Sequence, residues 1–275
     1  MPYFQTRDGT KVRYKELGTG RPVILIHGWP LSADSWDPVM IAMKDAGLRA
    51  IAYDRRGFGH SDHAASGYDY DTFADDLAGL IAELGLESDI GLAGFSMGGG
   101  EIARYMSRHG GKGVTAAALV SSVVPYMLQT DDNPDGVPQS VFDDMTAGMT
   151  KDHRHFFTDF FKDFYGDGWV TSDVSQEEKD WAWMTAMMAA KWAILESAKA
   201  FGTTDFRPDL AHFKVPTLVI HGTADRTVPI DATGRQVAAK VPGAKLIEYD
   251  GEAHGIFATQ TERLAQDLID FFRAN

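Results

Sequence analysis

Gly94-Phe95-Ser96-Met97-Gly98 is the segment that most strongly indicates the fold of this chain. It follows the apolar segment 90–93 and opens a segment whose apolar residues recur at helical spacing. A serine with a glycine two residues away on each side, between a strand and a helix, is the pattern of a nucleophile elbow. The glycines are needed because a Cβ atom in so tight a turn would collide with the neighbouring strand or helix. We therefore expect Ser96 to stand exposed at a sheet edge, beside the positive end of a helix dipole.

Strand-like and helix-like segments alternate on both sides of this turn. Five further segments read as strands: 23–26, 49–53, 116–120, 217–220 and 244–249. Helical stripes lie between and after them, for example at Phe73, Leu77 and Leu80, and at Leu264 and Leu268. Such an alternation predicts an α/β fold, with a mostly parallel central sheet flanked by helices on both faces.

The alternation stops after Val124. Residues 125–138 are rich in Pro, Gly, Asp and Asn and read as a loop, and the following segment to about 201 looks helical and is heavy in aromatic residues and methionine. The strand pattern returns at 217. We therefore predict a core formed by residues 1–124 and 210–275, with a helical cap inserted at 125–209.

Two residues downstream have the placement that a partner of Ser96 needs. A serine hydroxyl is a weak nucleophile until a base accepts its proton. In the α/β-hydrolase fold the order along the chain is Ser, Asp or Glu, then His, each on a loop after a strand. Asp225 and His254 fit this order, so we predict that fold, with Ser96 as nucleophile, His254 as general acid and base, and Asp225 as its orienting carboxylate. Asp205 and Asp209 are weaker candidates, because they precede the strand.

Two backbone N–H groups are predicted to form an oxyanion hole. One belongs to Met97, the residue after the nucleophile. The other belongs to the loop after the first core strand, His27-Gly28-Trp29-Pro30, where Trp29 has a free N–H and Pro30 has none. One such donor contributes roughly 2.7–4 kcal/mol of transition-state stabilisation.

Other kinds of site receive less support. Gly98-x-Gly100-x-x-Ala103 matches the dinucleotide pattern, but that pattern needs its first glycine at the strand end, where Ser96 stands. Neither His60-x-x-His63 nor His153-x-His155 is a strong metal motif, so we expect no metal. His27 and His221 each end a strand and are expected to hold loops by hydrogen bonds.

Composition limits the partners. The net charge is −13, with 39 acidic against 26 basic residues, which argues against nucleic-acid or anionic-membrane binding. There is no cysteine, so disulfides, thiolate metal sites and a cysteine nucleophile are excluded. The N-terminal residues lack the apolar core of a signal peptide, and we expect a cytoplasmic protein.

Several motifs together resemble the cofactor-free (non-haem) bacterial haloperoxidases of the α/β-hydrolase superfamily. The resemblance spans nearly the whole chain, the cap included. These motifs are His27-Gly28-Trp29-Pro30, Asp54-Arg55-Arg56-Gly57-Phe58-Gly59-His60-Ser61, the elbow with Gly99-Gly100-Glu101, Asp132-Asn133-Pro134-Asp135-Gly136-Val137-Pro138 and Thr204-Asp205-Phe206-Arg207-Pro208.

The resemblance implies an activity that needs no cofactor. Members are described as non-haem chloroperoxidases, aryl esterases, perhydrolases and γ-lactamases. The implied partners are a small ester, carboxylic acid or lactam, with hydrogen peroxide and halide, and family members are often homo-oligomers. We expect a serine esterase with perhydrolase and hence haloperoxidase activity. The alternatives are a γ-lactamase or amidase with the same triad, and a non-catalytic ligand-binding protein on this fold.

Overall fold

The computed structural model describes residues 2–169 and 174–275 and is built around one twisted sheet. Within these residues the sheet has eight strands in the order β1-β2-β4-β3-β5-β6-β7-β8. The six strands β3 to β8 pair in parallel. At one edge β2 pairs antiparallel with β4, and β1 pairs antiparallel with β2. The bounds are β1 (Tyr3–Gln5), β2 (Lys11–Leu17), β3 (Pro22–Ile26), β4 (Arg49–Tyr53), β5 (Ile90–Phe95), β6 (Val114–Val120), β7 (Thr217–Gly222) and β8 (Lys245–Tyr249). The predicted mostly parallel sheet is confirmed.

Strands β1 and β2 are absent from the sequence-based prediction. Strand β2 has an exposed Lys11, then buried Val12 and Arg13, then residues that are half-buried or exposed, so it carries no apolar run of the kind that marks the inner strands. It forms because its backbone pairs with β4, with Tyr14 opposite Tyr53. A strand close to the edge of a sheet can remain partly polar because one of its faces stays near solvent.

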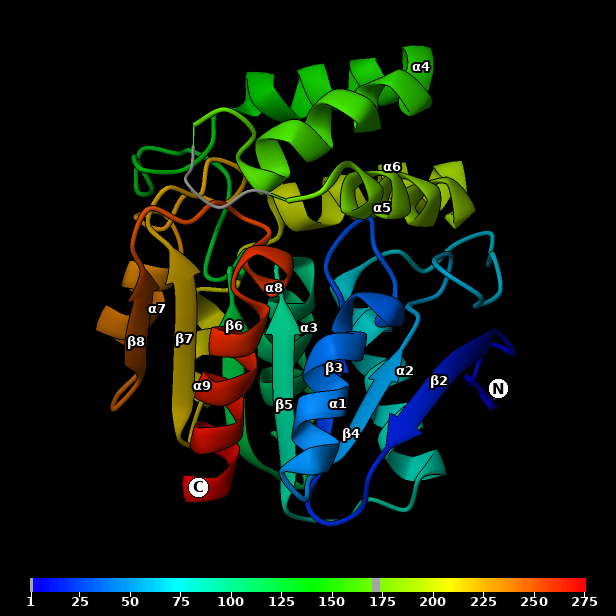
Figure 1. Cartoon of the computed structure of the whole chain (residues 1–275), viewed down its shortest axis with the longest axis vertical. Coiled ribbons are helices and arrows are strands. Elements are labelled where there is room, and N and C mark those ends of the chain that lie inside the picture. Colours follow the sequence, from blue (N-terminus) through cyan, green and yellow to red (C-terminus); the bar gives the residue numbers. More distant parts are fainter. Residues whose placement is uncertain (1, 170–173) are drawn as a thin grey trace.

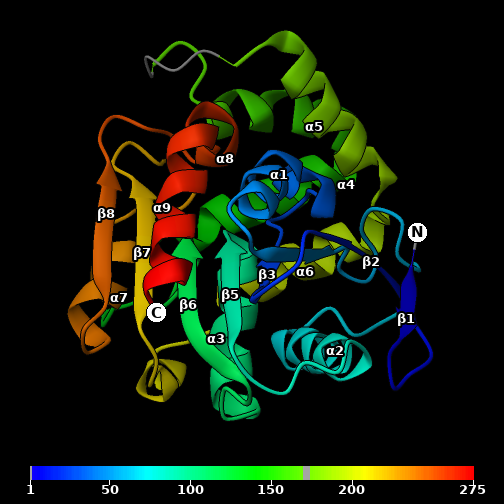
Figure 2. The same ribbon diagram turned by 60° about the horizontal axis from the view of Figure 1, so that its bottom comes forward.

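Helices cover both faces of the sheet (Figures 1 and 2). On one face α1 packs against α9, and on the other α2 packs against α3. The predicted stripe of α2 is buried at Phe73, Leu77 and Leu80, and the side chain of Asp69 caps the helix by accepting the N–H of Thr72. These helices and the shorter ones are η1 (Ala33–Trp36), α1 (Asp37–Asp45), α2 (Tyr70–Glu83), α3 (Met97–Arg108), η2 (Pro208–His212), α7 (Gly234–Lys240), α8 (Ile256–Thr259) and α9 (Thr261–Ala274).

Three more helices lie above the carboxyl ends of the parallel strands (Figure 1). They are α4 (Gln139–Tyr165), α5 (Gln176–Met188) and α6 (Lys191–Thr203), and they come between β6 and β7 in the chain. Helix α4 is interrupted at Asp152, which has non-helical backbone angles. The division into a core and a cap at 125–209 stays a prediction, and its residues 170–173, like residue 1 of the predicted core, lie outside the described part of the chain.

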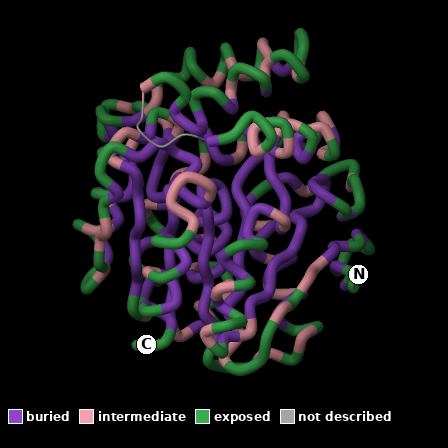
Figure 3. The backbone as a smooth tube through the Cα atoms, in the orientation of Figure 1, coloured by how far each residue is buried: buried purple, intermediate pink, exposed green. Residues whose placement is uncertain are grey.

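Burial follows the layers. The central strands are buried along most of their length, whereas α4 and α5 expose much of their surface (Figure 3). All six residues of β5 are buried, which places the end of this strand deep inside the molecule. No helix of the described residues is long and apolar enough to cross a membrane.

Candidate active site

Ser96 occupies the sharp turn between β5 and α3. Its backbone has φ +53° and ψ −118°, a conformation that non-glycine residues rarely adopt and that clusters at functional sites. The turn is held by the N–H of Ser96, which donates to the carbonyl of Val120 at 2.8 Å. A Cβ atom on Gly94 would lie 2.5 Å from the carbonyl oxygen of Gly98, so this approach requires glycine.

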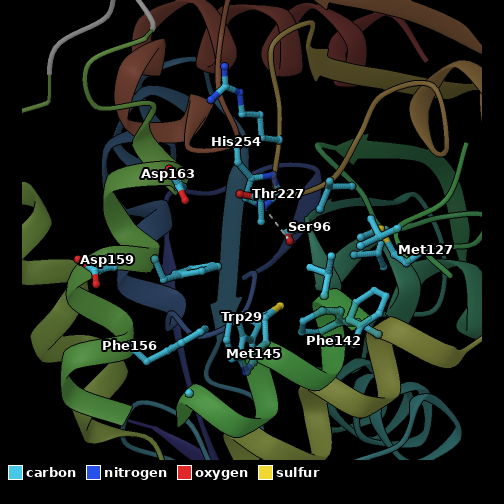
Figure 4. A pocket seen from close by; sticks show the side chains of 18 of the residues that line it. Trp29, Ser96, Met127, Phe142, Met145, Phe156, Asp159, Asp163, Thr227 and His254 are labelled. Carbon is cyan, nitrogen blue, oxygen red and sulfur yellow. Dashed lines mark hydrogen bonds between the residues drawn. The ribbon is translucent and has the colours of Figure 1, made fainter. Parts of the chain in front are cut away.

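The three side chains predicted to act together meet above this turn. His254 Nε2 lies 3.0 Å from Ser96 Oγ, and His254 Nδ1 lies 2.6 Å from Asp225 Oδ2. Because an ionised carboxylate only accepts hydrogen bonds, Nδ1 carries the proton and Nε2 is free to accept the serine hydroxyl. All three residues are buried, so the expectation that Ser96 stands exposed is wrong, and its access is through a cavity that it lines. Figure 4 shows His254 directed at Ser96. The arrangement can therefore move a proton from Ser96 to a base that is held in one tautomer.

Asp225 is held by more than the triad histidine. Its Oδ1 accepts the backbone N–H groups of Thr227 at 2.9 Å and Val228 at 2.8 Å. His221 Nε2 lies 3.3 Å from its Oδ2 and 2.9 Å from the carbonyl of Val228. Burial raises the pKa of Asp225, but His254 and His221 outweigh burial and lower this pKa to about 2. The carboxylate therefore stays ionised at neutral pH.

The two predicted oxyanion donors come from segments that adjoin Ser96. Met97 is the first residue of α3, and Trp29 follows Gly28, where an added Cβ would lie 3.0 Å from Ser96 Cβ. Within the described residues, no hydrogen-bond acceptor is assigned to either backbone N–H. Both groups are thus free to bind an oxyanion beside Ser96.

The side chain of Trp29 has a separate part in the site. Its ring packs against Phe157, Phe160 and Phe201, with centroid separations of 5.3 to 5.5 Å. Its Nε1 donates to the carbonyl of Ile194 at 3.1 Å. These contacts tie the loop His27-Gly28-Trp29-Pro30, the predicted oxyanion loop, to helices α4 and α6.

A group of buried polar side chains lies beside this loop, and only His27 among them was assigned a role from the sequence. It consists of His27, Tyr53, Arg55 and Glu101, each no more than 1% exposed, and we call it the anchor cluster. Arg55 and Tyr53 both hydrogen-bond Glu101, which lies one turn into α3. Arg55 Nη2 donates to the carbonyl of His27 at 2.8 Å. Arg55 therefore links the helix that starts at Met97 to the loop that carries Trp29.

His27 confirms the expected loop-holding role. Its Nε2 accepts the backbone N–H of Arg55 at 3.0 Å, and its Nδ1 lies 2.9 Å from the carbonyl of Gly28. Burial, followed by the charge of Arg55, holds the pKa of His27 well below 6.5, so the ring is neutral and one nitrogen accepts while the other donates. For the rest of the anchor cluster the sequence offered two weak signals. Glu101 follows the three glycines 98–100, and Arg55 lies in a motif to which no chemistry was assigned.

A cavity of about 690 Å³ opens above Ser96 and His254. Its wall is mostly apolar and aromatic, with α4 contributing a large part (Figure 4). Five charged side chains also line it: Lys151, Asp152, Asp159, Asp163 and Arg226. The apolar wall includes Trp29, Met127, Phe142, Met145, Phe156 and Phe160. A cavity of this size and lining suits a small, largely apolar molecule.

The glycines of the dinucleotide-like pattern are not open to a ligand. A Cβ on Gly100 would lie 2.5 Å from the ring of Tyr70 and 2.6 Å from that of Phe206. These rings cover the position where a pyrophosphate would approach. Within the described residues, no group of three or more potential metal-ligating side chains lies together.

Comparison with known proteins agrees with this fold. The family model described as alpha/beta hydrolase fold matches residues 21–261. The chain is 46% identical to a non-heme chloroperoxidase of Kitasatospora aureofaciens, over 98% of this chain and 99% of that protein. It is 39% identical to a bifunctional esterase/perhydrolase of Acinetobacter calcoaceticus, over the whole of both chains. The crystal structure of a bromoperoxidase from Bacillus anthracis superposes with a TM-score of 0.94 at 37% identity, covering 99% of this chain and 100% of that one.

Proposed function

This chain belongs to the α/β-hydrolase fold family, and we propose that it is a serine esterase that also converts carboxylic acids and hydrogen peroxide into peracids. The observation that carries the proposal is the continuous hydrogen-bonded chain from Ser96 through His254 to Asp225. Its relatives are named non-heme chloroperoxidases, a haloperoxidase and an esterase/perhydrolase.

Acylation follows from the geometry of the three side chains. His254 Nε2 accepts the proton of the Ser96 hydroxyl as the oxygen attacks the carbonyl carbon of the substrate. Asp225, ionised and fixed by two backbone N–H groups, stabilises the imidazolium that forms. The imidazolium then protonates the leaving group, and an acyl-Ser96 ester remains.

The oxyanion of the tetrahedral intermediate is assigned to the N–H groups of Trp29 and Met97. Both adjoin Ser96 and are free of protein acceptors within the described residues. The anchor cluster supports this assignment, because it joins the two segments that carry the donors. Donors held in place before the reaction stabilise the developing charge without a reorganisation cost.

The second half of the reaction decides which product forms. With water, His254 accepts a proton as water attacks the acyl-enzyme, and the products are a carboxylic acid and free Ser96. With hydrogen peroxide as the nucleophile, the product is a peracid. The peracid transfers one oxygen to a halide ion in solution, giving hypohalous acid and the carboxylate. The names of the relatives support both branches.

A fluorophosphonate probe separates an enzyme from a non-catalytic binder. The protein should be labelled, Ser96→Ala should not be labelled, and the exposed-serine control Ser66→Ala should be labelled like the wild type. Labelling of Ser96→Ala at the wild-type rate would contradict the hydrolase assignment.

Halide oxidation tests the peracid branch. Oxidation with peroxide should proceed in acetate and fall in a buffer without a carboxylate. Equal rates in the two buffers would contradict the peracid route. A parallel comparison of aryl acetates with a bicyclic γ-lactam decides between the esterase and the lactamase alternative.

A cytoplasmic location and a homo-oligomeric state stay predictions.

A further inference from the structure

Two methionines line the cavity in which the proposed peracid forms. Of the described methionines, Met127 and Met145 belong to its wall together with Ser96 and His254 (Figure 4). Met127 is only 2% exposed, while Met184 and Met188, away from this cavity on α5, are 56% and 42% exposed. Exposure alone therefore predicts that Met184 and Met188 react first with an oxidant from solution.

We propose that Met127 and Met145 are oxidised to methionine sulfoxide by the peracid made at Ser96, a modification that rests on the proposed peracid synthesis. The thioether sulfur donates an electron pair to the terminal peroxy oxygen, and the O–O bond breaks. The peroxy proton passes to the carboxylate that leaves, so one peracid and one thioether give one carboxylic acid and one sulfoxide. Sulfur is oxidised and the peracid is reduced.

The cavity favours this reaction because its reactants meet before the peracid escapes. The peracid is released from acyl-Ser96 into an enclosure of about 690 Å³ that both thioethers line. Reactants held in one cavity meet far more often than at the same amounts in bulk solution. The neighbouring wall residues Val123, Val137 and Phe142 have hydrocarbon side chains and offer no thioether to compete.

The modification changes the wall on which substrate rests. A sulfoxide is polar, whereas the methionine thioether is apolar. Placed among Trp29, Phe142 and Phe156, it weakens contact with an apolar acyl or aryl group. Peracid synthesis thus raises the KM for apolar esters with successive turnovers, and the damage begins in the cavity rather than at the surface.

Peptide mass spectrometry during turnover tests the order of oxidation. The protein is incubated with acetate, hydrogen peroxide and an excess of polymer-bound thioether, which destroys released peracid and is too large to enter the cavity. Met127 and Met145 should gain one oxygen at least about tenfold faster than Met184 and Met188, a modest factor beside those known for intramolecular reactions. In Ser96→Ala under the same conditions, the exposed pair should react first. Equal rates of the two pairs in the active protein, or oxidation of Met127 that does not need Ser96, would overturn the proposal.

Two variants connect oxidation with function. Leucine is close to methionine in volume and has no thioether, so Met127→Leu/Met145→Leu should keep its own starting esterase KM through more peroxide turnovers than the wild type. The matched control Met184→Leu/Met188→Leu should drift in KM like the wild type. An equal drift in both double variants would contradict the assignment. Halide oxidation measured in parallel distinguishes failure of the modification from failure of the peracid function. If halide oxidation depends on Ser96 while Met127 remains reduced, only the proposed modification is wrong. If halide oxidation is absent, the proposed peracid function is wrong as well.

Discussion

The molecule has two buried groups of polar and charged side chains, the triad and the anchor cluster, and they differ in their access to the cavity. Ser96 and His254 line the cavity, whereas His27, Tyr53, Arg55 and Glu101 of the anchor cluster do not. Both groups combine a carboxylate with hydrogen-bond donors in a buried setting. Access to the cavity, rather than burial of charge, therefore separates the group suited to chemistry from the group suited to holding geometry.

The carboxylates of the two groups also differ in their pKa. For Asp225 burial is outweighed by two histidines, and the pKa falls to about 2. For Glu101 burial raises the pKa and outweighs the opposing effect of Arg55. Asp225 also accepts two backbone N–H groups on one oxygen. The triad carboxylate is thus built to keep its charge, and the comparison can be tested by removing each group in turn.

Ser96→Ala should give the largest effect. Removing the nucleophile is expected to lower kcat for an aryl acetate on the order of 10^6-fold, as in other triad enzymes. The free energy of unfolding should change little, because Ser96 is small and its backbone contacts remain. Steady-state kinetics and urea unfolding measure the two quantities. A kcat within tenfold of the wild type would remove Ser96 from the chemistry.

Asp225→Asn should rank next. The amide leaves the shape of the site but no longer selects the His254 tautomer with a free Nε2, and kcat should fall about 10^4-fold. Asp231→Asn, an exposed aspartate farther along the same loop, is the control and should leave kcat near the wild-type value. Similar losses in both variants would mean that the loop as a whole, rather than the carboxylate, matters.

Glu101→Gln should move stability more than the triad variants do. It leaves the buried Arg55 guanidinium without its ionic partner, and breaking a buried pair costs about 3–5 kcal/mol of unfolding free energy. Because the oxyanion loop then loses its anchor, kcat should fall by up to about 100-fold, the scale of a small displacement at the site. The exposed control Glu87→Gln should stay within about 0.5 kcal/mol. An unchanged kcat in a folded Glu101→Gln protein would show that the cluster serves stability alone.

The stability supplied by Asp225 should depend on pH in a defined direction. Its folded-state pKa of about 2 lies below the unfolded value of 3.8, so its contribution is present above pH 4 and is lost as the pH falls toward 2. The shift corresponds to about 2 kcal/mol. The gap in unfolding free energy between wild type and Asp225→Asn should therefore shrink by that amount from about pH 5 to pH 2. A gap that widens on acidification would reverse the assigned sign.

Tyr53→Phe should give the smallest effect. It removes one hydrogen bond to Glu101 while Arg55 remains, so unfolding free energy should fall by about 1–3 kcal/mol and kcat should change only a few-fold. Tyr14→Phe, opposite Tyr53 in the β2–β4 pair, is the matched control and should cost less. Denaturant unfolding of the two variants compares them directly, and equal losses would mean that the Tyr53 hydroxyl has no special part.

Much of the candidate site was predictable because its signals are local. The elbow is five consecutive residues, and its glycines are required by a tight local turn. His254 lies 158 residues from Ser96 in the chain, and Asp225 lies 29 residues from His254. They were still predicted, because the carboxyl ends of parallel strands meet at one edge, so residues after separate strands converge.

The parallel sheet, the order of serine, aspartate and histidine, and the two oxyanion donors were all predicted from the sequence. Periodicity and strand ends are written along the chain. The three-dimensional structure was needed to see that Arg55 reaches Glu101, 46 residues away, that β1 and β2 join the sheet, and that Met127 and Met145 share a cavity with Ser96. The physical reason is that these contacts join side chains from segments with no common local pattern. Only packing brings them within hydrogen-bond or van der Waals distance.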